Sequence, residues 1–414
     1  MQHRARVSSI LLLVVLSLFV TILFVEGASR LFYYFRWGHL YNIQPSNYSL
    51  SLGWELAPGS YSGFHINSQG FRRPADVSLL PAKNTFRIFI IGGSTAFGTN
   101  GLYPQFEPKP LGSEDTIDYH LETMLRARHK GTHFEVINAA VPEYRVFQEI
   151  TLFREKLVNF KPHLVIFLDG HNDISFLTTA SRLKLSPAPY WESRHFARGQ
   201  RVLNSSGFLG PLYYFDVYLG RASYFYHGIS ELFQRLQNVS VGLGGAVPLT
   251  GGTLGDDIFR LSDEKLSIEK YKGQLDELDQ VIPLYLDQVQ DLRAIAFSRE
   301  MKILYVLQPE ILVEDPAHLT TKEFQIQEFA FRHHHVWGTL SWRYLAPKIA
   351  SILERLSDNQ FQFLNLVTIA GSESEQVYTD YCHLTSRGNY VVAEKLYPRV
   401  VDLIGLARPG LDLK

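Results

Sequence analysis

The stretch Phe86–Gly98 reads FRIFIIGGSTAFG and decides the fold. Its largely apolar first half, Phe86–Ile91, is short and ends at two glycines, as a buried strand does before a sharp turn. Gly92 and Gly93 permit a tight strand-to-helix turn that exposes the hydroxyl of Ser94. A plain turn explains the same residues. Nucleotide binding is disfavoured, because the stretch lacks both the GxGxxG spacing and the Gly-Lys-Ser/Thr ending.

Four more short apolar runs predict strands, and they are Phe134–Ile137, Leu164–Leu168, Ile303–Leu307 and Phe361–Leu366. Runs rich in Ile, Val and Phe without strict alternation are typical of a parallel sheet covered on both faces. Helical stripes begin near Ile117, Phe147 and Leu275, and a last one runs from Val391 to Val400, with a kink expected at Pro283. The pattern predicts an α/β fold, a three-layer doubly wound (flavodoxin-like) parallel sheet of five strands.

The composition excludes several classes of protein. With 414 residues, 40 basic and 41 acidic side chains and a net charge of −1, the chain lacks the positive excess of a dedicated nucleic-acid binder. The single cysteine, Cys382, rules out an intrachain disulfide and a cysteine-based zinc or iron–sulfur cluster. The consecutive His333, His334 and His335 would splay around a helix, so they are not expected to share a metal. No cofactor and no metal are expected.

The N-terminal run Val7–Val25 contains no charged residue and can nearly cross a hydrocarbon layer of about 30 Å. Arg4 and Arg6 precede it, which predicts a cytoplasmic N-terminus and an extracytoplasmic body. An uncleaved anchor is the favoured interpretation, and a cleaved signal peptide or a buried core helix are the alternatives. The aromatic residues between Leu31 and Trp37 suit the membrane–water boundary.

The predicted domains are a cytoplasmic stub and transmembrane anchor over 1–27, a neck and irregular segment over 28–82, and an α/β domain over 83–408. This last domain carries a long aromatic insertion at 174–262. A segment of that length and composition is either a lid or substrate wall, or else a second packing layer or partner surface.

Ligands of a doubly wound sheet bind outside the carboxyl ends of its strands, so the residues that follow each strand are the candidates for chemistry. Asp169–Asp173 follows the third strand, and Gly170 lets the backbone turn so that Asn172 can direct its amide at the pocket. A side-chain amide can stabilise an oxyanion without being protonated. On its own, this block is also explained as a loop turn.

The block Asp380–Thr385 lies after the fifth strand. Asp380 and His383 are three residues apart, so the carboxylate can hold the imidazole in the tautomer that a serine nucleophile requires. Thr385 is a good N-cap for the final helix. A capping turn with a solvated histidine is the alternative for this pair. Cys382 is interpreted as a packing residue rather than a nucleophile.

Taken in order, these blocks resemble the SGNH (GDSL-type) hydrolase superfamily, and within it the bacterial branch whose first block reads Gly-Gly-Ser. The match runs from about Trp54 to Ile404, and it includes Asn67–Arg72, Leu307–Pro309 and, most specifically, Asp380–Asn389. The resemblance implies an SGNH-hydrolase fold with Ser94 as nucleophile, His383 as general base and Asp380 as its orienter. It also implies an oxyanion hole formed by the Ser94 N–H, a backbone N–H of the second block and the Asn172 side chain.

The second block, Asn138–Tyr144, departs from the family pattern, because Glu143 stands where the family has glycine. A backbone N–H survives that change, so we place Glu143 in the expected oxyanion hole together with Ser94, Asn172 and Gly170. A glycine with positive φ could not be replaced freely, and a carboxylate that pointed inward would oppose an oxyanion.

These observations predict a membrane-anchored serine ester hydrolase, or an acyl transferase, that acts on O-acyl esters of cell-surface glycan or lipid. The expected partners are this substrate and the membrane, the latter through residues 7–25, with no nucleic acid. The expected location is a single-pass position in the cell membrane with the catalytic domain extracytoplasmic. The alternative is a non-catalytic assembly or glycan-binding protein that uses the aromatic insertion as its contact surface.

Overall fold

The computed structural model describes residues 2–37, 46–49, 51–61, 63–101, 103–106, 108–109, 111–182, 223, 225–226, 229, 272–333, 336–372 and 375–406. The chain divides into two compact units. One comprises Met1–Pro45 and Glu192–Gly252, and the other comprises Ser46–Trp191 and Thr253–Lys414. The second unit contains the predicted α/β domain.

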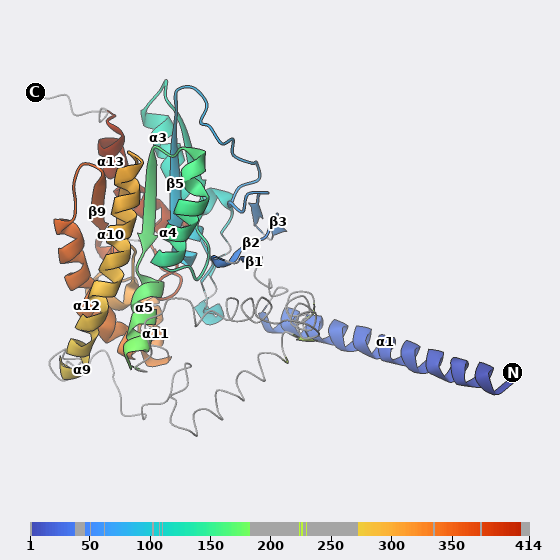
Figure 1. Ribbon diagram of the computed structural model, residues 1–414. Helices are drawn as coiled ribbons and strands as arrows, with labels where there is room; N and C mark the ends of the chain where they lie inside the picture. The colour runs from blue at the N-terminus through green and yellow to red at the C-terminus, as the bar shows by residue number, and fades with distance from the viewer. Residues whose placement is uncertain are drawn as a thin grey trace, which may run out of the picture. The chain divides into compact units, whose positions relative to one another are not determined.

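The second unit is built on a parallel sheet of five strands in the order β6-β5-β7-β8-β9, drawn in Figure 1. The strands are β5 (Thr85–Gly92), β6 (His133–Asn138), β7 (Leu164–Asp169), β8 (Lys302–Leu307) and β9 (Phe361–Asn365). Four of them contain a whole predicted apolar run, and β9 covers all but the last residue of Phe361–Leu366, so the predicted fold class and strand positions are confirmed. The chain starts in the middle of the sheet, adds β6 on one side and then reverses, which is the flavodoxin-like order.

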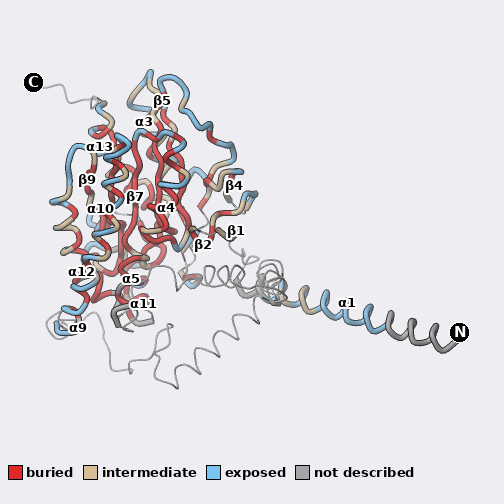
Figure 2. The backbone as a smooth tube through the Cα atoms, in the orientation of Figure 1, coloured by how far each residue is buried: buried red, intermediate tan, exposed pale blue. Residues whose placement is uncertain are grey.

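The three inner strands form the centre of the core. Ile90 of β5 pairs with Ile166 of β7, which in turn pairs with Leu304 of β8, and all three side chains are fully buried. The continuous buried path through the sheet is visible in Figure 2. Strands covered on both faces need apolar side chains at successive positions, which explains why these runs lack alternation.

Helices cover both faces of the sheet. On one face α3 (Ile117–Arg128) packs against α13 (Ser386–Ile404), and on the other α4 (Val146–Glu155) packs against α10 (Ile282–Ser298). The crossovers from β5 to β6 and from β6 to β7 run in opposite directions, so right-handed connections place α3 and α4 on opposite faces. The Thr385 hydroxyl accepts a hydrogen bond from the Gly388 N–H, as expected of the N-cap of α13.

Within the described residues, the other helical segments of this unit are α2 (Ser94–Phe97), η1 (Pro104–Phe106), η2 (Ser113–Asp115), η3 (Leu157–Phe160), α5 (His171–Arg182), α9 (Lys272–Asp276), η4 (Glu277–Val281), η5 (Ile311–Val313), η6 (Pro316–His318), α11 (Thr321–His333), α12 (Val336–Arg355) and η7 (Ala370–Ser372). Where we expected one helix kinked at Pro283, the structure has α9, the 3-10 turn η4 and α10. Pro283 is the second residue of α10, so its missing N–H costs no hydrogen bond there.

Four short strands occupy part of the segment that we expected to be irregular. β1 (Ser46–Ser49) pairs with β2 (Gly53–Leu56), and β3 (Gly59–Tyr61) pairs with β4 (Phe64–Ile66), both antiparallel. Strands of three or four residues contain too few side chains for a period of two to be recognised in the sequence.

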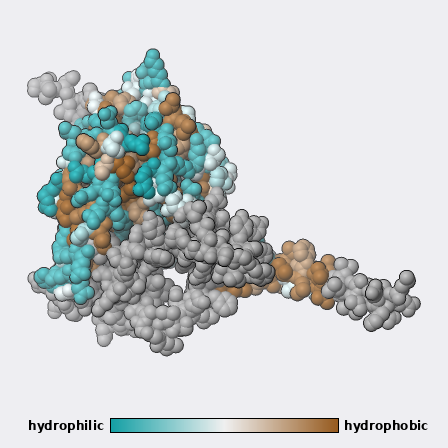
Figure 3. Space-filling model, in the orientation of Figure 1, coloured by the Kyte–Doolittle hydropathy of each residue, from teal (hydrophilic) through white to brown (hydrophobic). Residues whose placement is uncertain are grey.

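In the other unit, α1 (Gln2–Trp37) continues beyond the predicted anchor and through Gly27. Its section Leu13–Phe32 is long and apolar enough to cross a membrane and is not buried. Figure 3 shows this section as a hydrophobic surface. The exposure of Leu16, Phe19 and Leu23 argues against the buried-core-helix interpretation.

Several sequence predictions fall outside the described residues. They are most of the insertion at 174–262, with its aromatic residues and its glycine-rich end, and His334 and His335. The described part of the insertion begins as a continuation of α5, which runs to Arg182.

Candidate active site

Ser94 is placed at the carboxyl edge of the sheet by the turn that follows β5. It is the first residue of α2, and Gly93 is the N-cap. The N–H of Ser94 lies in the first turn, where backbone donors have no acceptor within the helix. The buried guanidinium of Arg72 holds the other end of α2 by donating to the carbonyl oxygens of Phe97 and, at 2.9 Å, Gly98. Arg72 therefore fixes the C-terminal end of the short helix that carries Ser94.

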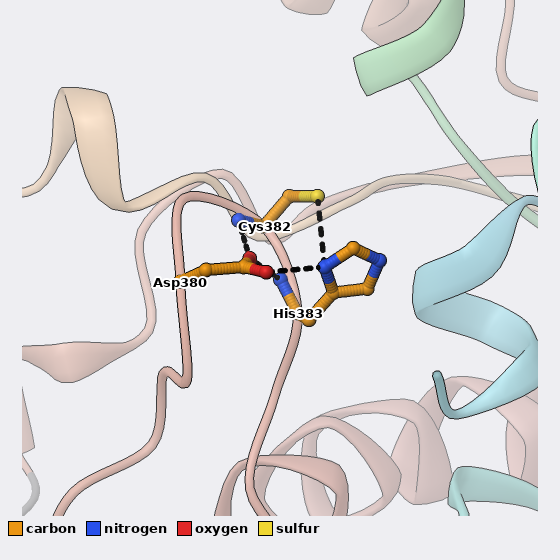
Figure 4. A group of neighbouring side chains, drawn as sticks. All are labelled: Asp380, Cys382 and His383. Atoms are coloured by element: carbon orange, nitrogen blue, oxygen red, sulfur yellow. Dashed lines mark hydrogen bonds and ion pairs between the residues drawn. The ribbon is translucent and has the colours of Figure 1, made fainter. Parts of the chain in front are cut away.

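The structure brings Ser94, His383 and Asp380 into one hydrogen-bonded line. His383 Nε2 lies 2.8 Å from Ser94 Oγ, and its Nδ1 lies 2.7 Å from Asp380 Oδ2. The second carboxylate oxygen, Asp380 Oδ1, accepts the backbone N–H groups of His383 at 2.8 Å and Cys382 at 3.0 Å. Figure 4 shows the carboxylate facing the imidazole. The capping turn with a solvated histidine is excluded, since His383 is buried and bonded at both ring nitrogens.

A second set of hydrogen bonds joins the turn that contains Ser94, residues 93–95, to the loop that contains His383, residues 377–385 (the His383 loop). The Thr95 hydroxyl donates to the carbonyl oxygen of Cys382 at 3.1 Å and accepts from the Gln308 side-chain amide at 3.1 Å. Thr95 follows Ser94, and Cys382 precedes His383, so this path fixes the positions of Ser94 and His383 relative to each other. Gln308 directly follows β8, which anchors the path in the sheet.

Two acidic side chains accept hydrogen bonds from residues at the start of the His383 loop. Glu323 Oε1 accepts the N–H groups of Val377 and Tyr378, and Glu314 Oε1 accepts the Tyr378 hydroxyl at 2.7 Å. Both carboxyl groups are buried. Charge-assisted bonds to backbone donors of this kind are stronger than neutral ones, so the loop has a defined geometry.

Asn172 reaches the same edge from the first turn of α5. Its Nδ2 donates to the carbonyl oxygen of Tyr144 at 2.7 Å, which fixes the amide orientation. A Cβ at Gly93 would lie 2.6 Å from Asn172 Nδ2, so only glycine allows this close approach beside Ser94. Gly170 has φ +132, and a Cβ there would lie 2.7 Å from Leu307 Cδ1. The glycine therefore lets the loop turn tightly over β8.

Glu143 keeps the backbone conformation that we expected to require glycine. Its φ is +66, a left-handed value that costs a residue with a Cβ roughly 1–2 kcal/mol. The residue is exposed. The departure at this position is thus accommodated by backbone strain, and Glu143 is not buried in the space between Ser94 and Asn172.

Sequence reasoning missed a second histidine–carboxyl pair beside this line. His171 Nδ1 lies 2.6 Å from Glu310 Oε2, and Glu310 is wholly buried. Burial, with a smaller contribution from the neighbouring His383, lowers the pKa of His171 to about 4. Burial, followed by the negative charge of Asp380, raises the pKa of Glu310. The sequence signal that could have revealed this pair was the position of Glu310, three residues after the end of β8 and at the same edge of the sheet.

Cys382 belongs to the same loop as His383. Its Sγ lies 3.9 Å from His383 Nδ1, and its side chain is buried. Ligand atoms of Asp380, Cys382 and His383 lie within 4.8 Å of one another, as a metal site would require. Two observations count against that interpretation. Both imidazole nitrogens are hydrogen-bonded already, and burial and then Asp380 raise the pKa of the thiol.

Three buried carboxyl groups, those of Asp169, Asp173 and Glu149, lie near the segment 169–173 that contains Asn172. Asp169 Oδ2 accepts the Tyr305 hydroxyl at 3.0 Å, and Asp173 Oδ2 accepts the Val146 N–H at 3.0 Å. Neither carboxyl oxygen of Glu149 has a hydrogen-bond partner among the described residues. Burial, and then the charges of Asp169 and Asp173, raises the pKa of Glu149 well above its ordinary value. Burial therefore favours the neutral acid form of Glu149 over the carboxylate.

No protein-family model matches the chain. No curated protein sequence matches it either. The solved structures similar to it include acylhydrolases, GDSL-like lipases and acetyl xylan esterases.

One such structure is a GDSL-like lipase from Bacteroides thetaiotaomicron, with 11% identity over 78% of this chain and 91% of that chain, at a TM-score of 0.34. Another is a carbohydrate acetylesterase family member from Sinorhizobium meliloti, with 14% identity, 78% and 100% coverage and a TM-score of 0.34. A third is an acetylxylan esterase from Geobacillus stearothermophilus, with 12% identity, 78% and 95% coverage and a TM-score of 0.33. Likenesses this weak carry no argument about the chemical reaction of this site, which rests on the geometry of its own residues.

The Gly93→Ala variant tests the placement of Asn172 against the nucleophile turn. The added methyl group would displace the Asn172 amide, and loss of one such donor costs about 10²–10³-fold in rate in an oxyanion hole. We expect Ser94 to react with a fluorophosphonate, a reagent for activated serines, at least about 10-fold more slowly, with little change in Tm. The control is Gly273→Ala in α9, where a Cβ meets nothing within 4 Å. An unchanged labelling rate would contradict the placement.

The Glu149→Gln variant tests the buried carboxyl group. A carboxyl whose folded-state pKa is raised binds its proton more tightly when folded, so its contribution to stability is present below the ordinary pKa and is lost as pH rises. Glutamine imitates the neutral acid at every pH. The variant should match the wild type in Tm near pH 4 and exceed it by several degrees at pH 8, measured on the full chain in detergent. The exposed Glu394→Gln control should show no such divergence, and a Tm difference independent of pH would refute the interpretation.

Proposed function

We propose that the protein is a serine ester hydrolase, with Ser94 as nucleophile, His383 as general base and Asp380 as the group that orients it. The observation that carries the proposal is the unbroken line from Ser94 Oγ to His383 Nε2 at 2.8 Å and from His383 Nδ1 to Asp380 Oδ2 at 2.7 Å. Asp380 fixes the imidazole with its proton on Nδ1, which leaves Nε2 able to accept the serine proton.

Catalysis would proceed by two acyl transfers. Ser94 Oγ attacks the ester carbonyl while His383 Nε2 takes its proton, and the same imidazole returns the proton to the departing alcohol. Water then attacks the acyl-enzyme, loses its proton to His383 and releases the acid and the free serine. The Asn172 amide and the Ser94 N–H, with a backbone N–H near Glu143, would hold the oxyanion in both steps. An alcohol in place of water would give acyl transfer with the same residues.

The substrate class follows from the proposed location. The helix α1 has a span long and apolar enough to cross a membrane, and Arg4 and Arg6 precede it. By the positive-inside rule, this orientation leaves the rest of the chain outside the cytoplasm. An esterase held there would meet O-acylated glycan or lipid at the cell surface.

The strained backbone at Glu143 favours a second candidate function, a non-catalytic binding protein that retains the fold. Residues at positive φ without glycine persist only where the surroundings hold them, and an oxyanion hole built on such a turn could have been adapted to another use. The intact hydrogen bonds among Ser94, His383 and Asp380 favour the enzyme. The two candidates differ in whether Ser94 is chemically reactive.

Labelling of the full chain by a fluorophosphonate tests the reactivity of Ser94. We expect one adduct, located at Ser94 by mass spectrometry, and hydrolysis of an aryl acetate that falls by at least about 10³-fold in Ser94→Ala. The matched control is Ser298→Ala at the exposed end of α10. A wild type that neither labels nor hydrolyses would support the binding protein, and activity retained in Ser94→Ala would reject Ser94 as nucleophile.

Alkaline carbonate extraction of cells that express the full chain tests the anchor. An uncleaved span should keep a 47.3 kDa protein in the membrane pellet, because α1 resists extraction as a transmembrane helix does. Replacing Leu16, Phe19 and Leu23 by Asp should release the protein into the supernatant. A shorter, extractable wild-type chain would indicate a cleaved signal peptide instead.

A further inference from the structure

We propose that His171, Glu310 and Tyr381 form a subsite for the alcohol half of the ester, which binds a hydroxyl group next to the ester oxygen. The inference rests on the proposed esterase function and specifies its substrate as an ester of a sugar or other polyol. Three features carry it: the rigid placement of the His171 ring, its position beside His383, and the absence of a positive charge on the His171 imidazole.

The His171 ring is held on three sides. Glu310 binds Nδ1 at 2.6 Å, while the Tyr381 and Trp342 rings stack at centroid distances of 4.8 Å and 6.2 Å, with interplanar angles of 26° and 20°. Nε2 lies 3.5 Å from Ser175 Oγ, the outer limit for a hydrogen bond. The side chain is 13% exposed. A ligand hydroxyl at ordinary distance would therefore make the stronger bond at Nε2.

The subsite lies where the alcohol departs. The Tyr381 ring contacts His171 on one side and lies 6.1 Å from the His383 ring, centroid to centroid. His383 is the group that would return a proton to the leaving oxygen, so a substituent of the alcohol extends from there toward Tyr381 and His171. His171 also directly precedes Asn172 at the start of α5, so the helix backbone fixes the two residues relative to each other.

The pair suits a neutral ligand rather than an anion. With the pKa of His171 lowered to about 4 and that of Glu310 raised, the histidine is uncharged near neutral pH and offers a hydrogen bond without a positive charge. The neighbouring carboxylate of Asp380 would repel a phosphate or carboxylate. A phospholipid headgroup is therefore disfavoured, whereas a sugar hydroxyl fits, with its ring packed against the half-buried Tyr381.

The test compares two substrates that differ by one hydroxyl group, trans-2-hydroxycyclohexyl acetate and cyclohexyl acetate. We expect the wild-type full chain in detergent to hydrolyse the hydroxylated ester with a kcat/KM at least about 10-fold higher, because a site that binds a hydroxyl rejects the analogue that lacks it. In His171→Phe, which keeps an aromatic ring for the stacking, this ratio should fall to about 1. The exposed His318→Phe variant of η6 is the matched control.

Protection of Ser94 from fluorophosphonate gives a second readout that needs no turnover. trans-1,2-Cyclohexanediol should slow labelling of the wild type more than cyclohexanol does, and this difference should vanish in His171→Phe. Equal losses with both esters, or an unchanged ratio in the variant, would overturn the subsite while leaving the esterase intact. If the wild type neither hydrolyses these esters nor labels at Ser94, the esterase function fails, and the subsite is rejected with it.

Discussion

The buried carboxylate of Asp380 is the constraint on which the site depends. Taking a charge out of water is costly, and the structure offsets that cost with bonds to the His383 imidazole and to two backbone N–H groups of its own loop. The same three bonds fold residues 380–383 into a turn of fixed shape. The orientation of the imidazole therefore follows from the requirement to satisfy a buried charge. Hydrogen bonds of Thr95 and Gln308 then fix the turn that contains Ser94 relative to that imidazole.

The strands were predictable because burial on both faces leaves an unambiguous mark. Leu164–Leu168 contains only apolar side chains, and in the structure each is fully buried in the centre of the sheet. The hairpins at 46–66 left no such mark, because each strand is only three or four residues long. The break before Pro283 was predicted as a kink. Its form as a 3-10 turn between two helices depends on the packing of η4 against α10, α9 and α12, which local sequence does not contain.

The candidate site was predictable where a residue lies within three positions of a strand's end, as Ser94 and Asn172 do, or within one turn of its partner, as Asp380 and His383 do. The pairing of His171 with Glu310 spans 139 residues. It exists because β7 and β8 align Asp169 opposite Leu307, so that the next residues of both strands leave the sheet together. The left-handed backbone at Glu143 was indicated only by the glycine that the resembled family has at this position, because a glutamate itself gives no sign of a positive φ.

The hydrogen bonds from Ser94 and Thr95 to the His383 loop join residues that the ribosome adds at widely separated times. Ser94 and His383 are separated by 289 positions, and α13 follows the His383 loop. A nascent chain thus contains the Ser94 hydroxyl long before it contains the His383 imidazole. The hydrogen bond between them cannot form until β9 and the loop after it have been made, so the proposed nucleophile has no base for most of the chain's synthesis.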